Sequence, residues 1–323
     1  MRLAIIDLGT VTSRLLIADV IEGRVHELEW HIRITHLGEG LDETGIIGDE
    51  ALAREVAACR DFMGAVQASE QRDGKPVERI VAVATSAMRD AANREQVRRE
   101  LRATGIDVAV IAGEREAELS FLGALSGFAP GYFIDTEPVL SLDVGGGSTE
   151  AILGLPKREG GEPHILATRS FDIGCRRIAD RFLLSDPPLA TEIAGARAWV
   201  RHEMRGHFEQ FIHAPQAAIA VAGTATTVVS VRDEMADYDP WKVHGSVVTA
   251  GELNQVFQKL AALSLKDRKL CTGLEPERAA VILGGLIILQ IALELAKLDS
   301  FIVSETDILQ GMALATWQGS KGF

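Results

Sequence analysis

Two turns in this chain carry an aspartate, glycine and hydroxyl residues in the same order. The first is Asp7-Leu8-Gly9-Thr10-Val11-Thr12-Ser13, and the second, 136 positions later, is Asp143-Val144-Gly145-Gly146-Gly147-Ser148-Thr149. Glycine lets backbone amides approach anionic oxygens, hydroxyl groups add donors, and a carboxylate binds Mg²⁺. One such turn alone is more typical of a plain hairpin. Two in matching positions indicate phosphate and metal chemistry.

A third element of this kind is Val221-Ala222-Gly223-Thr224-Ala225-Thr226-Thr227, an apolar run that leads into small residues. Amides at a helix N-terminus bind anions, so Gly223 and Thr224 are candidate phosphate ligands. Close packing of a helix on a strand through small residues is an equal alternative. The sequence has no Walker-type loop, nucleophile elbow or dinucleotide-binding glycine motif. His202 and His207 are spaced wrongly for a zinc site on one helix face.

Strands and helices alternate around these turns. In the first third, apolar runs predict strands at 3–8, 15–20, 25–34, 80–84 and 108–111, and helical periodicity predicts helices at 50–67, 93–103 and 114–125. The second part predicts strands at 139–144, 148–153, 164–171, 217–222 and 301–303, and helices at 176–183, 192–211, 251–262, 278–297 and after 306. This alternation predicts an α/β fold with parallel or mixed sheets.

The repeated turn and a change of composition divide the chain. Glycine and proline gather between Gly127 and Pro138, after a stretch with one earlier proline. We expect an N-terminal domain at 1–126 and a C-terminal domain at 127–305, with a terminal helix at 306–323 that packs back on the first. Because each part contains a strand, a turn and two further strands, we expect two domains of similar topology.

Composition limits the partners. The 323 residues carry a net charge of −13, with 47% apolar residues and three separated cysteines. An acidic chain is a poor general nucleic-acid binder, and no apolar run is long enough to span a membrane. The odd number of cysteines, without metal spacing, argues against a disulfide framework. We therefore expect a cytoplasmic protein with no nucleic-acid or membrane partner, while a small anionic ligand remains compatible.

A resemblance extends over nearly the whole chain. Besides the two turns, it is carried by Leu37-Gly38-Glu39-Gly40-Leu41, Ala84–Ala91 (Ala-Thr-Ser-Ala-Met-Arg-Asp-Ala), Ile111–Glu118, Gly174-Cys175-Arg176-Arg177, Val243-His244-Gly245 and Glu275–Ala279. These stretches resemble the exopolyphosphatase/guanosine pentaphosphate phosphohydrolase family, in the sugar kinase, heat-shock ATPase and actin superfamily. The resemblance implies two actin-like (ribonuclease H-like) domains, mixed sheets with helices on both faces, and an active-site cleft between the domains.

The resemblance also implies residue roles. Glu116, before the alanine of Gly-Glu-Arg-Glu-Ala, would activate the attacking water. Asp7, Asp143 and Glu150 would lie at the divalent metal. The implied phosphate-binding residues are Gly9, Thr10, Thr12, Arg89, Gly145, Gly146, Gly147, Ser148, Thr149, Gly223 and Thr224. Phosphoanhydride hydrolysis needs mainly positioning and charge stabilisation, which these residue types supply.

The implied reaction is release of terminal orthophosphate from inorganic polyphosphate with Mg²⁺ as cofactor. Mn²⁺ and a requirement for K⁺ stay open, as does a homodimer. Guanosine pentaphosphate, a nucleotide of the stringent response, is a second candidate substrate, and other nucleotides stay open. A polyphosphate- or nucleotide-binding regulator with little turnover is the main alternative, and a kinase of the same superfamily is a third.

Three positions depart from the family pattern. Val11 stands where an asparagine usually follows the first-turn hydroxyl, and Leu309 stands where an arginine is expected near the C-terminus. His36, instead of arginine, precedes Leu-Gly-Glu-Gly. Each change removes or alters a polar contact, so the regulator alternative rests on Val11 and Leu309.

Overall fold

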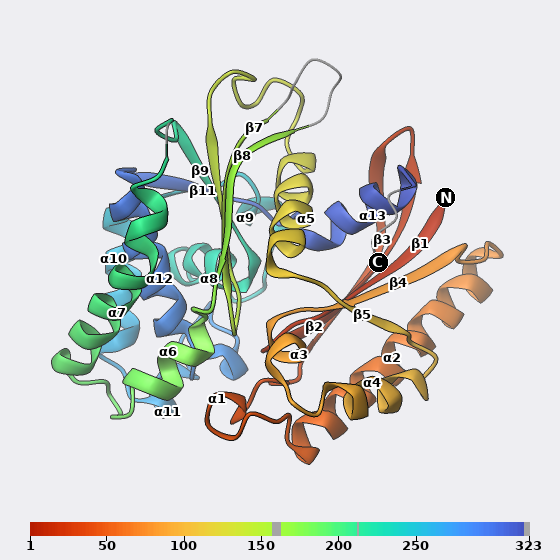
Figure 1. The fold of residues 1–323 in the computed structure, drawn as a ribbon, viewed down its shortest axis with the longest axis horizontal. Coiled ribbons are helices and arrows are strands. Elements are labelled where there is room, and N and C mark those ends of the chain that lie inside the picture. Colours follow the sequence, from red (N-terminus) through yellow and green to blue (C-terminus); the bar gives the residue numbers. More distant parts are fainter. Residues whose placement is uncertain (157–162, 212, 320–323) are drawn as a thin grey trace. The chain divides into compact units, whose positions relative to one another are not determined.

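The computed structural model describes residues 1–156, 163–211 and 213–319, and its chain forms two compact units (Figure 1). Unit 1 comprises Met1–Ser126 and Ile308–Phe323, and unit 2 comprises Gly127–Asp307. The chain therefore enters unit 2 after residue 126 and returns to unit 1 after residue 307.

Unit 1 is built on a five-stranded sheet in the order β3-β2-β1-β4-β5. Its strands are β1 (Arg2–Leu8), β2 (Thr12–Ile21), β3 (Arg24–Ile34), β4 (Arg79–Ala84) and β5 (Val108–Val110). The first three form an antiparallel meander, while β4 and β5 run parallel to β1. The helices are α1 (Leu41–Thr44), α2 (Asp49–Asp73), α3 (Ser86–Asp90), α4 (Arg94–Arg102), α5 (Gly113–Ser126) and α13 (Ile308–Trp317).

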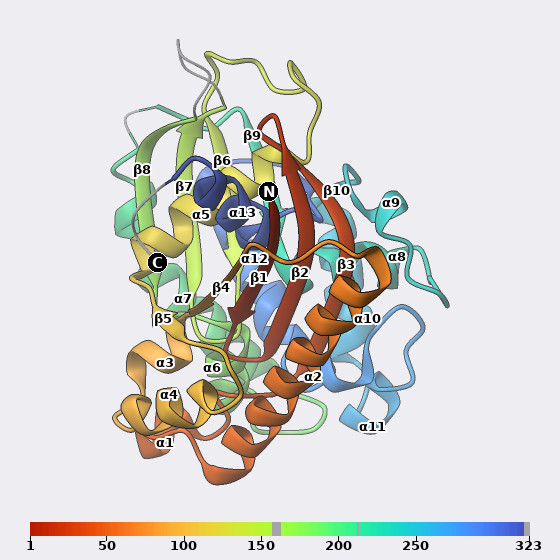
Figure 2. The same ribbon diagram turned by 90° about the vertical axis from the view of Figure 1, so that its right-hand side faces the viewer.

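Alternate residues of β1 enter two different cores of unit 1. Ile6 and Leu8 pack in the core that includes residues of α2 and α4, whereas Leu3 and Ile5 pack in the core that includes residues of α5 and α13. This period of two is the geometry of a strand covered on both faces. Helices α5 and α13 lie side by side in both ribbon views (Figure 2).

Unit 2 is built on a six-stranded sheet in the order β10-β11-β9-β6-β7-β8. Its strands are β6 (Val139–Val144), β7 (Thr149–Leu155), β8 (His164–Phe171), β9 (Ala217–Val221), β10 (Val247–Thr249) and β11 (Ser300–Val303). The helices are α6 (Cys175–Phe182), α7 (Ala190–Phe208), α8 (Ala222–Arg232), α9 (Pro240–Val243), α10 (Ala250–Ala261), α11 (Leu265–Arg268) and α12 (Ile282–Ala296). Leu140, Leu142 and Val144 of β6 pack into the large core with these helices.

The two units share one topology. In unit 2, β6, β7 and β8 form an antiparallel meander, and β9 and β11 continue the sheet parallel to β6. These strands correspond in order to β1, β2, β3, β4 and β5 of unit 1. The internal repeat predicted from the two turns is therefore confirmed at the level of strand order, and β10 is an added edge strand in unit 2.

Some element boundaries differ from the sequence prediction. The helix predicted at 50–67 is α2 and runs to Asp73, where Gly74 ends it in the left-handed conformation with φ of 64°. The helix predicted at 278–297 begins only at Ile282, because Pro276–Arg278 form a 3₁₀ turn first. The short strand β10 and helix α3 were not predicted, since three to five residues carry little periodicity.

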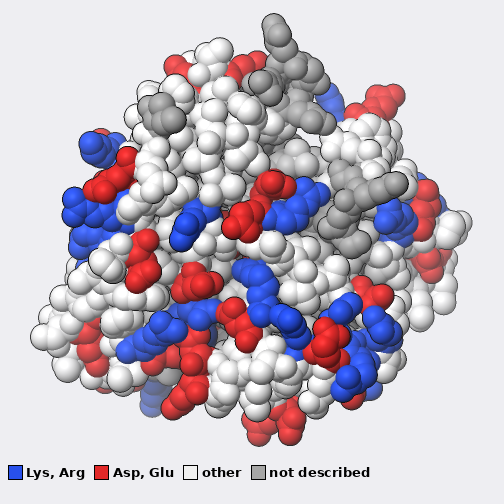
Figure 3. Space-filling model, in the orientation of Figure 1, with Lys and Arg blue, Asp and Glu red and all other residues white. Residues whose placement is uncertain are grey.

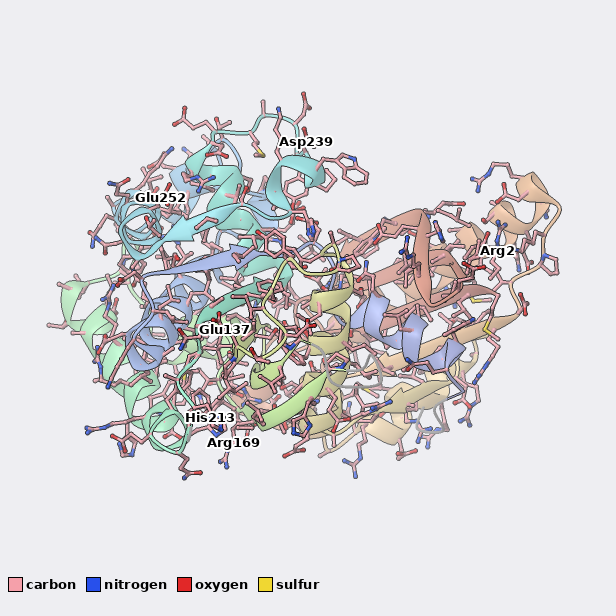
Figure 4. The ribbon with its side chains drawn as sticks, turned by 90° about the horizontal axis from the view of Figure 1, so that it is seen from above. Arg2, Glu137, Arg169, His213, Asp239 and Glu252 are labelled. Carbon is pink, nitrogen blue, oxygen red and sulfur yellow. The ribbon has the colours of Figure 1, made fainter. Side chains whose placement is uncertain are left out.

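Polar contacts fix the ends of several elements. Arg2 of β1 donates to Asp19 of β2 and, over 2.7 Å, to Asp73 at the end of α2. Thr249 and Glu252 form a capping box at the start of α10. Figure 4 labels Arg2 and Glu252.

Basic and acidic side chains are interspersed on the face displayed in Figure 3.

Within the described ranges, no helix combines the length and the apolar composition that crossing a membrane requires.

Candidate active site

The first turn of unit 1 is a tight connection between β1 and β2. The amide of Gly9 donates to the carbonyl of Thr12 over 3.1 Å. A Cβ atom on Gly9 would lie 2.7 Å from that oxygen, which only glycine avoids. Thr10 is buried, and its carbonyl accepts from the amide of Gly38 over 2.9 Å. The stretch that contains Gly38 therefore packs directly on this turn.

Asp7 is held by a residue that the sequence analysis did not single out. Asp7 of β1 lies opposite Arg14 of β2, and Arg14 Nη2 donates to Asp7 Oδ2 over 2.7 Å. Residues directly opposite in an antiparallel pair have side chains on the same face. The register of the predicted hairpin was the signal that could have shown this pair.

Arg89 and Glu116 form an ion pair in unit 1. Arg89 on α3 donates through Nη1 to Glu116 Oε2 over 2.6 Å and to the carbonyl of Ile111 over 3.2 Å. The Glu116 side chain is 11% exposed and lies in the first turn of α5. The structure therefore brings the predicted base and the predicted phosphate-binding arginine into contact.

The sheet of unit 1 explains why Arg89 and Glu116 lie close together. Strands β1, β4 and β5 are parallel neighbours, and each leads at its carboxyl end into a candidate element: the first turn, α3 and α5. The amide of Thr85 donates to Leu8, and that of Ile111 donates to Ala84. Ligands bind at such carboxyl ends in α/β sheets. Asp7, Arg89 and Glu116 therefore lie at or just after the carboxyl ends of three neighbouring strands of the same sheet.

The second turn lies in unit 2 and repeats the geometry of the first. The amide of Gly145 donates to the carbonyl of Ser148 over 3.0 Å, as Gly9 does to Thr12. Three successive carbonyls then turn toward α6. Gly145 accepts from the amide of Cys175, Gly146 from the amide of Arg176, both over 2.9 Å, and Gly147 from Arg177 Nε over 2.6 Å.

These contacts determine where the amides of the second turn point. In a trans peptide the C=O and N–H groups point in opposite directions. Because the carbonyls of Gly145, Gly146 and Gly147 face α6, the amides of the following residues, up to Ser148, face away from it. Successive amides turned to one side form an anion-binding concavity. The structure therefore supports the predicted phosphate role for the amides of Gly146, Gly147 and Ser148.

Gly174 allows α6 to approach this turn. A Cβ atom on Gly174 would overlap the peptide between Gly146 and Gly147. In the sequence, Gly174 belongs to a stretch that carries the family resemblance, and no role was predicted for it. Its role is visible only once the two segments are seen in contact.

Two carboxylates lie side by side at the same end of the sheet of unit 2. Asp143 of β6 is opposite Glu150 of β7, so both side chains lie on one face. Asp143 is 7% exposed and Glu150 is fully buried. Glu150 Oε1 accepts from the hydroxyl of Ser170 on β8 over 2.7 Å. The corresponding pair in unit 1 is Asp7 and Arg14, where the second residue is a cation.

The donor set of unit 2 suits a divalent cation that also binds phosphate. Among the described residues, no three His, Cys, Asp or Glu side chains form a complete metal cage. Mg²⁺ commonly takes one or two carboxylates and fills its other positions with water and phosphate oxygens. Two adjacent buried carboxylates meet this need, because their mutual repulsion is relieved by a cation.

The third element begins α8 at the end of β9. Ala222 has a φ of 66°, an uncommon conformation for a residue with a side chain. A Cβ atom on Gly223 would overlap the guanidinium of Arg278, so glycine admits this arginine. Arg278 Nε also donates to Glu275 over 2.5 Å. Arg278 was not among the predicted site residues, although its stretch carried the resemblance.

Some predicted hydroxyl ligands are engaged within unit 2. Thr149 Oγ1 donates to the carbonyl of Ile173 over 2.6 Å, and Thr224 Oγ1 donates to the carbonyl of Val144 over 3.3 Å. Both residues are buried. Their hydroxyl groups therefore tie the second turn and α8 to the sheet, while Thr12 in unit 1 is half-buried and contributes its carbonyl to the first turn.

Comparisons with known proteins agree with this arrangement. The chain is 37% identical to "Exopolyphosphatase 2" of Mycobacterium tuberculosis, over 97% of this chain and 98% of that protein. The solved structure of an exopolyphosphatase from Cytophaga hutchinsonii is 26% identical, with a TM-score of 0.88 and 99% of each chain covered. A Ppx/GppA family member from Aquifex aeolicus is 28% identical, with a TM-score of 0.78, over 100% of this chain and 99% of that one.

These similarities confirm the fold class predicted from the sequence, an α/β protein of two similar actin-like domains with mixed sheets. The pattern of the Ppx/GppA phosphatase family matches residues 16–318, which is most of the chain and includes both units. The chain therefore belongs to the Ppx/GppA phosphatase family.

Proposed function

We propose that this protein is a metal-dependent exopolyphosphatase that releases orthophosphate from the end of inorganic polyphosphate. The observation that carries the proposal is the turn Gly145–Ser148, in which the amides of Gly146, Gly147 and Ser148 turn away from α6. Such a turn beside two carboxylates suits a phosphate with its counter-cation. The name of the Mycobacterium tuberculosis relative supports polyphosphate as the substrate.

The base in this reaction is Glu116. Its carboxylate accepts a proton from a water molecule as the water oxygen attacks the terminal phosphorus. A P–O bond forms to that oxygen, and the P–O bond to the next phosphate breaks. The shortened chain leaves with the bridging oxygen. General-base assistance of this kind contributes typically about 10²–10⁴ in rate.

Each unit has its own proposed phosphate-binding groups. The amides of Gly146, Gly147 and Ser148 bind phosphate oxygens, and Arg89 contributes a guanidinium whose fork geometry suits them. Arg89 also fixes the orientation of Glu116 through their ion pair. The amide of Thr10 in the first turn and Gly223 at the start of α8 complete the proposed phosphate contacts, whereas the amide of Gly9 is engaged by the carbonyl of Thr12.

Asp143 and Glu150 would hold the divalent cation. When bound, Mg²⁺ supplies positive charge that stabilises the phosphate oxygens during bond breaking. Asp7 is the weaker donor of the three predicted ligands, because Arg14 already holds one of its oxygens. Mn²⁺ is the alternative cation, since it also prefers oxygen donors.

A reducing compartment fits the cysteines of the structure. Cys59, Cys175 and Cys271 are all free thiols. Structural disulfides are typical of oxidising compartments. A cytoplasmic location therefore stays part of the proposal.

The proposal is tested with purified full-length protein, Mg²⁺ and polyphosphates of several lengths. Orthophosphate release is measured together with chain length on a gel, and guanosine pentaphosphate is assayed in parallel. Orthophosphate release with stepwise shortening supports the proposal. Tight polyphosphate binding without release contradicts it in favour of a regulator. Transfer of the terminal phosphoryl group of ATP to an acceptor, with ADP formed and no orthophosphate released, contradicts it in favour of a kinase.

A further inference from the structure

Three residues form a row across neighbouring strands of unit 2: Asp143 on β6, Glu150 on β7 and Ser170 on β8. We propose that Ser170 is a positioning residue that orients the Glu150 carboxylate for the divalent cation. This inference rests on the metal site in the proposed function. Neither the family resemblance nor the candidate site residues had assigned a role to Ser170.

The contact is specific in geometry. Ser170 lies directly opposite Glu150, and its hydroxyl donates to Glu150 Oε1 over 2.7 Å. A hydrogen bond to an ionised carboxylate at this distance is of the strong, charge-assisted kind. Since Ser170 has one O–H group, it binds one of the two carboxylate oxygens and thereby sets the rotation of the group.

The hydrogen bond from Ser170 to Glu150 matters because Glu150 is buried. Glu150 is fully buried beside Asp143, which is 7% exposed, so two carboxylates share a site with little water. Without a fixed donor, Glu150 could relieve its repulsion from Asp143 by turning away. The hydroxyl of Ser170 holds it in place before the cation arrives. Outer contacts of this type typically change metal affinity by about 10–100-fold.

The other unit of the same chain supplies an internal comparison. In unit 1 the equivalent row is Asp7, Arg14 and Ile32. There the central residue is an arginine that pairs with Asp7, and its neighbour on the edge strand is apolar. The hydroxyl is therefore found in the row whose central residue is a carboxylate, as a positioning role requires.

The test compares variants of the full-length protein. Ser170→Ala removes the hydroxyl, and Ser170→Thr retains it on a β-branched residue suited to a strand. Thr168→Ala is the matched control, because Thr168 lies on the same face of β8 opposite Ile152, and its hydroxyl has no hydrogen-bond partner in the described part of the chain. Ser170→Cys replaces the hydroxyl with a weak donor, and this variant is used in place of Ser170→Ala if Ser170→Ala does not fold.

Binding of Mn²⁺ is measured by electron paramagnetic resonance, alone and with tripolyphosphate, beside the Mg²⁺ concentration for half-maximal phosphate release. We expect Ser170→Ala to weaken Mn²⁺ binding about 10–100-fold, and Ser170→Thr and Thr168→Ala to stay near the parent protein. Unchanged Mn²⁺ binding in Ser170→Ala, or equal weakening in Thr168→Ala, overturns the inference.

The two proposals fail separately. A parent protein that binds Mn²⁺ and loses it on Ser170→Ala substitution, but releases no phosphate, supports the role of Ser170 and contradicts the hydrolase. A parent protein that releases phosphate while Ser170→Ala binds Mn²⁺ normally supports the hydrolase and overturns the role of Ser170. A parent protein that binds no Mn²⁺ in either condition overturns the inference.

Discussion

Arg89 Nη1 lies 2.6 Å from Glu116 Oε2, so the proposed base is held by the arginine proposed to bind the phosphate chain. The same Nη1 atom donates to the carbonyl of Ile111, which precedes α5. Arg89 is thereby fixed to both the start of α5 and its first-turn carboxylate. One side chain orients the base and supplies positive charge for the substrate.

Replacing Arg89 should affect both functions. We expect Arg89→Ala to lower kcat for polyphosphate by about 10²-fold or more and to raise KM, because Glu116 loses its partner and phosphate loses a cation. Arg89→Lys should recover only part, since an ammonium group lacks the planar fork. Steady-state kinetics measure this, with Arg115→Ala as control because Arg115 pairs with Glu118 on the same helix. Normal kinetics for Arg89→Ala would contradict the role.

Removing the divalent cation should stop turnover. With EDTA we expect no orthophosphate release, and Mg²⁺ in excess should restore it, because the chain is acidic and must neutralise a polyanion locally. Asp143→Asn should raise the Mg²⁺ requirement by about 10-fold or more, since an amide is a poorer ligand for this cation. Asp180→Asn is the control, because it changes an exposed carboxylate that pairs with Arg176. Undiminished release in EDTA is the contrary result.

The second turn should not tolerate a residue larger than glycine at position 174, which packs against the turn. Gly174→Ala introduces a methyl group that overlaps the Gly146 carbonyl, so the turn or α6 must move. We expect a loss of about 1–3 kcal/mol in unfolding free energy and a clear rise in KM for polyphosphate. Gly206→Ala is the control, because a Cβ atom there meets open space. Urea unfolding and kinetics compare the two, and equal behaviour would refute the close approach.

A buried carboxylate beneath the first turn should make stability depend on pH. Burial, with a smaller contribution from the charge of Asp7, raises the pKa of Glu55 from 4.5 to about 7, although hydrogen bonds from Ser13 and Thr35 oppose the rise. The folded state therefore keeps its proton more tightly than the unfolded chain. The stability that this proton provides is complete below about pH 4.5 and is lost as the pH rises through about 7.

Glu55→Gln should remove this dependence. A rise from 4.5 to about 7 corresponds to a free energy on the order of 3 kcal/mol across the window. We expect the unfolding free energy of the parent protein to fall relative to that of Glu55→Gln between pH 5 and pH 8, as measured by urea unfolding. A difference that stays constant with pH would show that Glu55 does not titrate in this range.

The sequence predicted the fold well because its repeats and its apolar periodicity are local properties. The strand at 164–171 was placed with both ends correct, and the helix at 93–103 differs from α4 by one residue at each end. What could not be predicted depends on contacts between segments. Arg14 and Ser170 gain their roles from strand register, and Thr149 and Thr224 direct their hydroxyl groups to backbone carbonyls.

Two residues that depart from the family pattern, Leu309 and Val11, are buried in unit 1. Leu309 on α13 is fully buried in the apolar core of unit 1, among residues of β1, β2 and α5. Val11 is buried, and its carbonyl accepts from the amides of Thr35 and His36, each over 3.0 Å. Both residues therefore stabilise unit 1 by packing or backbone contacts. The sequence showed the missing polar groups and could not show this packing.

The central claim is that Glu116 activates the attacking water. It is tested most directly by orthophosphate release from polyphosphate and Mg²⁺ with Glu116→Gln, beside Glu118→Gln, whose carboxylate pairs with Arg115 at the surface. We predict that Glu116→Gln lowers kcat by about 10²–10⁴-fold while it still binds polyphosphate, and that Glu118→Gln remains near the parent rate. A Glu116→Gln protein that releases phosphate at the full rate would contradict the account.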